Sequence, residues 1–276
     1  MFSVLMSVYY KEKPNYLDLA FKSLYDQTVK DFQIVLICDG PLTKKLDDRI
    51  KVWKSISKKK LLVVRLKENK GLGIALQEGL KHCKYDIIAR MDADDYCDPT
   101  RLEKQYNFLK HNLSIDVVSC TLKEFVKTPD NVISLKPAYR THQEIEKKFW
   151  FRSPINHPAA MFRKKAVLEV GGYKDLLFLE DYYLWARIWV NGGKFWNLSE
   201  PLYYQRINQN LYRRRGGIIQ LKNEIFIRHY LYKNHKIRFL QFLTTIVIQV
   251  FLRLVPSKVR RLLWSIVRKK YKVPKV

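Results

Sequence analysis

The chain has 276 residues, a hydrophobic fraction of 47% and a formal net charge of +26 at pH 7. This length can bury a full core, and the hydrophobic fraction excludes a wholly disordered chain. The charge is uneven, because all 26 acidic residues lie at or before Glu224 and 13 lysines and arginines follow it. The C-terminal part is therefore a localised basic segment.

Strands alternate with helices in the first hundred residues. Apolar runs predict strands at 2–10, 32–38, 61–66 and 86–91. Apolar residues at helical spacing predict helices at 14–25, 46–56 and 71–83. The residues at 2–10 lack the basic leader and cleavage site of a signal peptide, so we expect them to begin the fold. This alternation predicts an α/β fold with a mostly parallel central sheet.

The second half of the chain is less regular. We expect a strand at 117–126 and helices at 102–109, 143–150 and 180–189. No linker rich in glycine or serine separates the halves, so both should share one sheet. The four cysteines are far apart in sequence and show no CxxC pair, which predicts reduced thiols in a cytosolic compartment.

The strand predicted at 86–91 is followed by three carboxylates, those of Asp92, Asp94 and Asp95. The C-terminal ends of strands are where open α/β sheets bind ligands. Crowded carboxylates repel one another unless a cation compensates, and such oxygen ligands suit Mg²⁺ or Mn²⁺. A solvated acidic turn is the alternative. If the strand stays extended, alternation places Arg90, Asp92 and Asp94 on one side.

Two further turns follow predicted strands. Asp39 precedes Gly40 at the end of the second strand, where it either reaches a ligand or only initiates a turn. The stretch 69–73 opens a helix with two glycines, which allow close approach of a ligand. It has Leu76 where a dinucleotide fingerprint requires glycine, and this disfavours hydride transfer.

Taken together, these stretches resemble the family 2 glycosyltransferases, which use nucleotide-sugar donors on a GT-A-type fold. The resemblance rests on 3–10, 35–40, 69–73, 92–95 and 171–173 with 180–181, in this order and spacing. It covers residues 2–215 and implies a catalytic domain at 1–215. Within that domain, 1–97 would bind the nucleotide and 98–215 the acceptor, and a basic helical segment follows at 216–276.

The resemblance also implies roles for individual residues. Asp94 and Asp92 would hold Mg²⁺ or Mn²⁺, which neutralises charge on the leaving nucleotide. Asp181 would be the general base that deprotonates the acceptor hydroxyl, with Glu180 in support. A capping role at a helix start is the alternative for this pair. The donor, expected to be a UDP-sugar, would contact Ser7, Tyr9, Asp39, Asn69, Gly71, Arg90 and Asp92.

Three side chains are candidates for the acceptor side. His157 lies in a stiff loop between Asn156 and Pro158, although a core or capping histidine is the more frequent outcome. Trp150 and Tyr173 could stack on a sugar ring or belong to the core.

The C-terminal segment predicts association with a membrane. In the apolar stretch 239–255, polar residues recur every fourth position, which makes an amphipathic helix near the lower length limit for a membrane span. A second apolar stripe, at 259–267, has lysines and arginines around it. An apolar face with a cationic flank is typical of a helix in the interface of an anionic membrane, so we expect residues 237–276 to dock there. Packing on the protein's own core or on a dimer partner is the alternative.

The sequence therefore predicts a metal-dependent, inverting glycosyltransferase, peripheral on the cytoplasmic face of the plasma membrane. It would transfer a sugar to a lipid-linked oligosaccharide acceptor in the synthesis of O-antigen, capsule or exopolysaccharide. Nucleic acid is not an expected partner, because no nucleic-acid-binding motif accompanies the charge. The alternatives are a sugar nucleotidyltransferase, whose glycine-rich loop is missing after Tyr10, and a non-catalytic membrane-binding scaffold.

Overall fold

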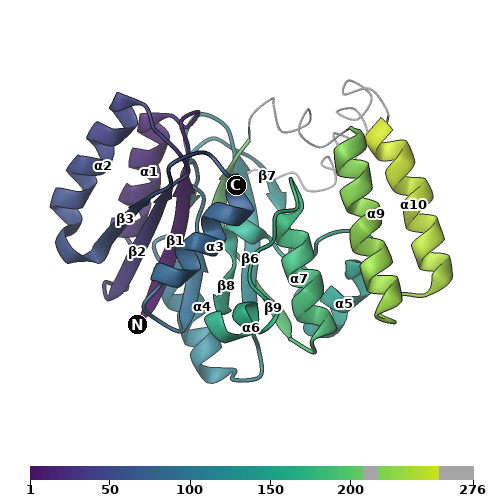
Figure 1. Ribbon diagram of the computed structural model, residues 1–276. Coiled ribbons are helices and arrows are strands. Elements are labelled where there is room, and N and C mark those ends of the chain that lie inside the picture. Colours follow the sequence, from purple (N-terminus) through teal and green to yellow (C-terminus); the bar gives the residue numbers. More distant parts are fainter. Residues whose placement is uncertain (208–216, 255–276) are drawn as a thin grey trace.

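The centre of the fold is a nine-stranded sheet with helices on both faces (Figure 1). This computed structural model describes residues 1–207 and 217–254. The strand order is β3-β2-β1-β4-β8-β6-β9-β5, and β7 pairs with β6. The mixed α/β class with a mostly parallel central sheet is confirmed.

The N-terminal half follows the predicted alternation. Its elements are β1 (Phe2–Val8), α1 (Pro14–Tyr25), β2 (Phe32–Cys38), α2 (Lys44–Ser57), the 3₁₀ turn η1 (Lys58–Lys60), β3 (Leu61–Arg65), α3 (Leu72–His82) and β4 (Ile87–Arg90). The pairs β1–β2, β1–β4 and β2–β3 are all parallel, so their carboxyl ends meet at one edge. This edge carries the Asp39 turn, the 69–73 stretch and the acidic run.

The second half adds strands that pair in both directions. Its elements are β5 (Tyr96–Cys97), α4 (Arg101–His111), β6 (Val117–Phe125), β7 (Val132–Lys136), α5 (His142–Phe149), η2 (His157–Ala159), β8 (Met161–Arg163), α6 (Lys164–Glu169), α7 (Glu180–Val190) and β9 (Phe195–Arg206). Strand β8 lies antiparallel between β4 and β6 and joins the halves, which confirms that they share one sheet. The functional division at residue 97 stays a prediction.

The sequence pattern does not predict β9, the longest strand described. The strand pairs in parallel with β6, but its register shifts between Leu198 and Tyr203. Pro201, which has no N–H to donate, lies within this irregular stretch together with the exposed Ser199 and Glu200. These residues interrupt the alternation of apolar and polar side chains that marks a strand.

Two hydrophobic cores fill the space between the sheet and its helices. Alternate residues of β1 enter different cores: Val4 and Met6 face α1, α2 and α4, whereas Leu5 faces α3 and the later helices. The second core contains Trp185 of α7 and, at its edge, Ile227 of α9 (Ile218–Lys233). All four cysteines are free and buried, so no disulfide contributes.

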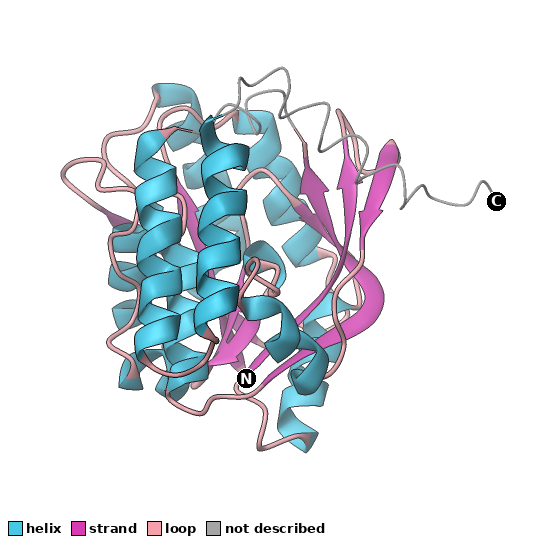
Figure 2. Cartoon of the chain, turned by 90° about the vertical axis from the view of Figure 1, so that its right-hand side faces the viewer, coloured by secondary structure: helices cyan, strands magenta, loops and turns pink. Residues whose placement is uncertain are grey.

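Helices α9 and α10 (Phe239–Leu254) lie side by side at one end of the molecule (Figure 2). The polar line of α10 faces inward: Thr245 and Gln249 are buried, and Arg253 pairs with Glu224 of α9. Its apolar residues face outward instead, namely Phe239, Leu240, Leu243, Val247, Val250 and Phe251, all exposed. None of the helices in the described residues has the length and apolar character needed to cross a membrane. The apolar stripe predicted at 259–267 lies outside the described residues.

Candidate active site

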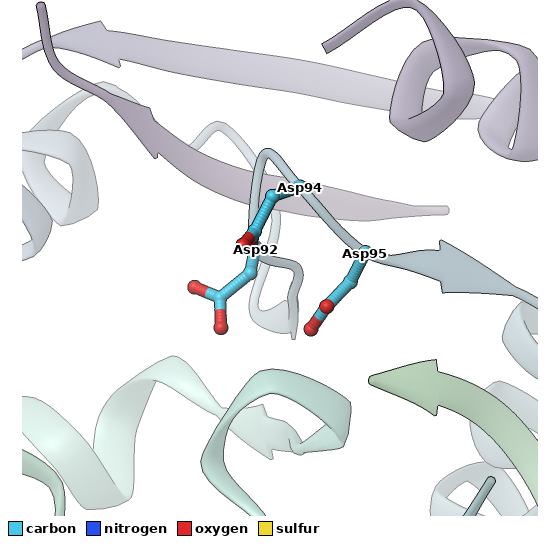
Figure 3. A group of neighbouring side chains, drawn as sticks. All are labelled: Asp92, Asp94 and Asp95. Carbon is cyan, nitrogen blue, oxygen red and sulfur yellow. The ribbon is translucent and has the colours of Figure 1, made fainter. Parts of the chain in front are cut away.

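Three carboxylates meet in the turn between β4 and β5. Strand β4 ends at Arg90, so the expectation that alternation aligns Arg90, Asp92 and Asp94 is wrong. The turn itself brings Asp92, Asp94 and Asp95 together, each with a carboxylate oxygen within 4.8 Å of the others. Figure 3 shows the three side chains leaving this turn toward the same side.

Burial and mutual repulsion disfavour the ionised forms of two carboxylates in the cluster. Burial, with the neighbouring Asp92 and Glu12, raises the pKa of Asp94 to about 7. Burial and the other two carboxylates hold the pKa of Asp95 well above its usual range. One oxygen of Asp95 is buried without a hydrogen-bond partner among the described residues. An all-oxygen donor set in this state suits Mg²⁺ or Mn²⁺, which would favour the ionised form of every member.

Arg206, the last residue of β9, supports this turn and was not among the predicted site residues. Its Nε donates to the carbonyl oxygen of Asp94 at 2.8 Å, and its backbone N–H donates to a carboxylate oxygen of Asp95 at 2.7 Å. Its guanidinium lies 3.7 Å from the centre of the Tyr16 ring. Nothing in the sequence near Arg206 indicates this role, because the strand that delivers it is hidden by its irregular centre.

Arg90 lies beneath the cluster rather than on its surface. It is fully buried, and its Nη2 donates to the carboxylate of Asp92, which is about a third exposed. Arg101 donates to the carbonyl oxygen of Arg90 at 2.6 Å, and the Tyr203 hydroxyl accepts the N–H of Asp92 at 3.1 Å. Arg90 therefore orients Asp92. Its contact with a donor stays a prediction.

The Asp39 turn and the 69–73 stretch form one unit. The carboxylate of Asp39 accepts the N–H groups of Lys70 at 2.7 Å and Gly71 at 3.0 Å, and Asn69 donates to the carbonyl oxygen of Asp39 at 3.1 Å. Gly40 has φ +84°, and a Cβ there would lie 2.6 Å from the backbone nitrogen of Asn69. The structure thus brings these predicted donor residues together at the sheet edge.

The positions of Ser7 and Tyr9 are set by strand β1. Ser7 is the second-last residue of that strand and is half-buried. Tyr9 is exposed just beyond the strand, with its ring edge-on to the ring of Tyr10. Because β1 runs between β2 and β4, both residues lie between the Asp39 turn and the carboxylate cluster. Their contacts with a donor stay predictions.

Glu180 and Asp181 form the first turn of α7 and face the same region. Burial raises the pKa of Glu180 to about 7 and that of Asp181 to about 6, and the charge of Asp92 adds to the rise at Glu180. Gly73 lets α3 approach, since a Cβ there would lie 3.2 Å from Cβ of Glu180. One oxygen of Asp181 accepts the N–H of Tyr182 at 2.7 Å, a cap-like contact. Carboxylates with such pKa values can take up a proton near neutral pH.

Two of the three acceptor-side candidates meet. His157 and the Tyr173 hydroxyl are hydrogen-bonded at 2.9 Å, and both residues are buried. Burial and the nearby Arg90 hold the pKa of His157 well below its usual range, so the ring is neutral. The Tyr173 N–H donates to Gln77 of α3 at 2.7 Å. Trp150 lies apart, half-buried after α5. Acceptor contact stays a prediction for all three.

Known proteins share both sequence and fold with this chain. The family model for glycosyl transferase family 2 matches residues 3–171. The chain is 32% identical over 272 residues to the UDP-Gal:alpha-D-GlcNAc-diphosphoundecaprenol beta-1,3-galactosyltransferase of Escherichia coli, covering 98% of this chain and 97% of that one. It is 33% identical over 269 residues to the amylovoran biosynthesis glycosyltransferase AmsE of Erwinia amylovora, covering 98% and 100%.

A solved structure has a similar fold at lower sequence identity. The mannosyltransferase PcManGT of Pyrobaculum calidifontis, in complex with GDP-Man and Mn²⁺, superposes with a TM-score of 0.64 at 15% identity. The match covers 96% of this chain and 79% of that one. The match extends over both halves of the sheet and confirms the GT-A fold.

Proposed function

The chain belongs to glycosyl transferase family 2, and we propose that it is a metal-dependent, inverting enzyme that transfers a sugar from a UDP-sugar to a lipid-linked saccharide. It is a glycosyltransferase of the type that builds surface polysaccharides. The observation that carries the proposal is the meeting of two acidic groups at one edge of the sheet. The charge of Asp92 helps to raise the pKa of Glu180, and Glu180 lies against Gly73 of the donor stretch 69–73.

Asp92, Asp94 and Asp95 would hold the divalent ion. When bound, Mg²⁺ or Mn²⁺ supplies positive charge that offsets the negative charge developing on the leaving diphosphate. Arg90 orients Asp92, and Arg206 holds the backbone around Asp94 and Asp95. The Mn²⁺ in the complex of PcManGT supports this assignment.

Asp181 removes the proton from the acceptor hydroxyl as that oxygen attacks the anomeric carbon from the face opposite the diphosphate. Among the described residues only one of its carboxylate oxygens accepts a hydrogen bond, from the Tyr182 N–H, so the other can take the proton. Glu180, which has a still higher pKa of about 7, supports Asp181 or contacts the acceptor. A single base is sufficient, because the diphosphate leaves without a protein acid.

The similarity to the Escherichia coli relative supports a proposal for the donor and the acceptor. The Escherichia coli relative is named for a UDP-Gal donor and for an acceptor sugar carried on diphosphoundecaprenol, and it aligns over almost the whole chain. We therefore assign a UDP-sugar donor and a saccharide linked to a lipid through a diphosphate. Which sugar is transferred depends on the shape of the donor pocket, and a panel of UDP-sugars identifies it.

The protein is peripheral on the cytoplasmic face of the plasma membrane in this proposal. Its membrane-facing surface is the outward face of α10, where six large apolar side chains are 37–74% exposed. Soluble surfaces rarely gather so much apolar area without a partner. The charge of the C-terminal sequence suits an anionic surface, where each lysine or arginine contributes about 1 kcal/mol.

Release of UDP by the purified chain tests the proposal. The reaction contains Mn²⁺, a panel of UDP-sugars and GlcNAc diphosphate esterified to an undecyl chain. We expect UDP release that requires the acceptor, stops in EDTA and is abolished by Asp94→Asn. Asp48→Asn, a change at an exposed aspartate on α2, is the matched control. Full activity of Asp94→Asn in excess EDTA would contradict the metal role.

A further inference from the structure

The surface next to the carboxylates of α7 is apolar. Leu177 and Phe178 lie in the loop that leads into α7, and their exposed fractions are 48% and 41%. On α9, Ile219 is 60% exposed and Phe226 is 45% exposed. We call these four residues the acceptor-side patch. None of them has a part in the site described above.

The two halves of the patch are in contact. Asn223 of α9 donates to the carbonyl oxygen of Leu177 at 2.9 Å. Ile219 and Phe226 lie four residues before and three residues after Asn223, so all three share one face of the helix. The ring centre of Phe226 is 5.1 Å from that of Tyr183, which is in the first turn of α7. The patch therefore borders the turn that carries Glu180 and Asp181.

The backbone of the loop is strained at Phe178, one of its two exposed apolar residues. Phe178 has φ 70°, a left-handed conformation that is rare for an aromatic residue. A hydrogen bond from the N–H of Leu179 to the carbonyl oxygen of Leu176, 2.9 Å long, closes the turn around it. Such strained backbone is found preferentially at functional sites.

The α9 part of the patch also lies close to one end of α10. The N–H of Gly217 donates to the carbonyl oxygen of Arg253 at 3.1 Å, which places the start of α9 beside the end of α10. Ile219 therefore lies near the end of α10 that exposes Val250 and Phe251. Figure 2 shows the two helices side by side along their whole length. Exposed apolar side chains therefore occur both on the proposed membrane face and beside the carboxylates of α7.

We propose that the acceptor-side patch binds the hydrocarbon chain of the lipid-linked acceptor and guides it from the membrane to Asp181. The inference rests on the proposed function. An acceptor whose sugar reaches the half-buried Asp181 can lead its lipid out past the first turn of α7, where the patch lies. The exposed Lys222, on the same side of α9 as Ile219 and Phe226, complements the negative charge of the linking diphosphate. A water-soluble acceptor would have no use for this surface.

Chain-length dependence of binding tests the inference. Titration calorimetry compares GlcNAc diphosphate esterified to an undecyl chain with the methyl ester, both below the micelle concentration. We expect the wild-type chain to bind the undecyl compound at least tenfold more tightly. In a double variant, Phe178→Gly with Ile219→Ser, the two affinities should become equal. Glycine keeps the left-handed backbone at position 178, so the loop retains its shape.

Controls separate the patch from general effects. Leu113→Ser, at a residue 78% exposed after α4, should keep the wild-type preference for the undecyl chain. The double variant should still bind anionic vesicles, because α10 is intact. Equal binding of both compounds by the wild-type chain would overturn the inference. So would a double variant that loses vesicles but keeps the chain preference. Absence of UDP release with every donor would instead refute the proposed function.

Discussion

Glu224 is the common partner of two arginines at the junction of α9 and α10. Its side chain is 4% exposed, and those of Arg228 and Arg253 are 1% and 11% exposed. Glu224→Ala leaves both guanidinium groups without this carboxylate, and breaking a buried ion pair costs about 3–5 kcal/mol. Arg228 keeps a 2.8 Å hydrogen bond to the carbonyl oxygen of Phe151. We therefore expect the lower end, about 3 kcal/mol.

Thermal unfolding of the full chain measures this loss. For a chain of this size, about 3 kcal/mol lowers the melting temperature by roughly 6–12 °C. Hydrogen exchange should locate the effect, because the amides of α10 should lose protection before those of the central sheet. The matched control is Glu200→Ala, which breaks a pair with Lys104 whose side chains are 50% and 43% exposed. Exposed pairs contribute about 0–1 kcal/mol, so its melting temperature should barely change.

Equal losses in Glu224→Ala and Glu200→Ala would refute the reasoning. That result would mean that the guanidinium groups of Arg228 and Arg253 find water or other acceptors once Glu224 is removed. A large loss without faster exchange in α10 would place the cost elsewhere in the fold. Only a large loss that begins in α10 supports a charge network that holds the outer helix on α9.

The remaining predictions concern the site. Asp181→Asn should keep the affinity for UDP but lower turnover by about 10²–10⁴, as expected for loss of a general base; turnover near the wild-type value would place the base elsewhere. In the wild-type chain, activity should rise with pH through about 6, because burial raises the pKa of Asp181 to about 6. The folded state favours the protonated form, so Asp181→Asn should also raise the melting temperature above that pH and leave it unchanged near pH 4. Arg206→Lys removes the Nε–H that donates to the carbonyl oxygen of Asp94. Mn²⁺-dependent binding of UDP should therefore weaken about tenfold, the equivalent of one charge-assisted hydrogen bond. Wild-type affinity in calorimetry would mean that other contacts hold the turn.

Much of the N-terminal half was predictable because its signals are local. Each strand of the parallel region is a short apolar run, and each helix repeats its apolar residues at helical spacing. The three carboxylates of 92–95 are close in sequence, so any tight turn brings them together. The alternation argument for them is wrong, because β4 ends at Arg90 and a turn replaces the extended chain.

The remaining parts of the site depend on contacts between distant segments. Glu180 lies against the donor stretch at Gly73, where a side chain would crowd both Glu180 and the carbonyl oxygen of Lys174. Arg206 lies 112 residues after Asp94, at the end of a strand whose irregular centre conceals it. The hydrogen bond between His157 and Tyr173 likewise joins a loop to a turn that no local pattern relates.

The strands and helices of the parallel half, the acidic run and the amphipathic character of the last described helix can all be inferred from the residues alone. Those properties depend on the spacing of residues within one segment. Which face of α10 turns inward depends instead on packing between distant helices. Periodicity shows that the two faces of α10 differ in polarity, but not which of them is buried. Arg253 pairs with the buried Glu224 of α9, so the polar face of α10 turns inward and its apolar face stays outside.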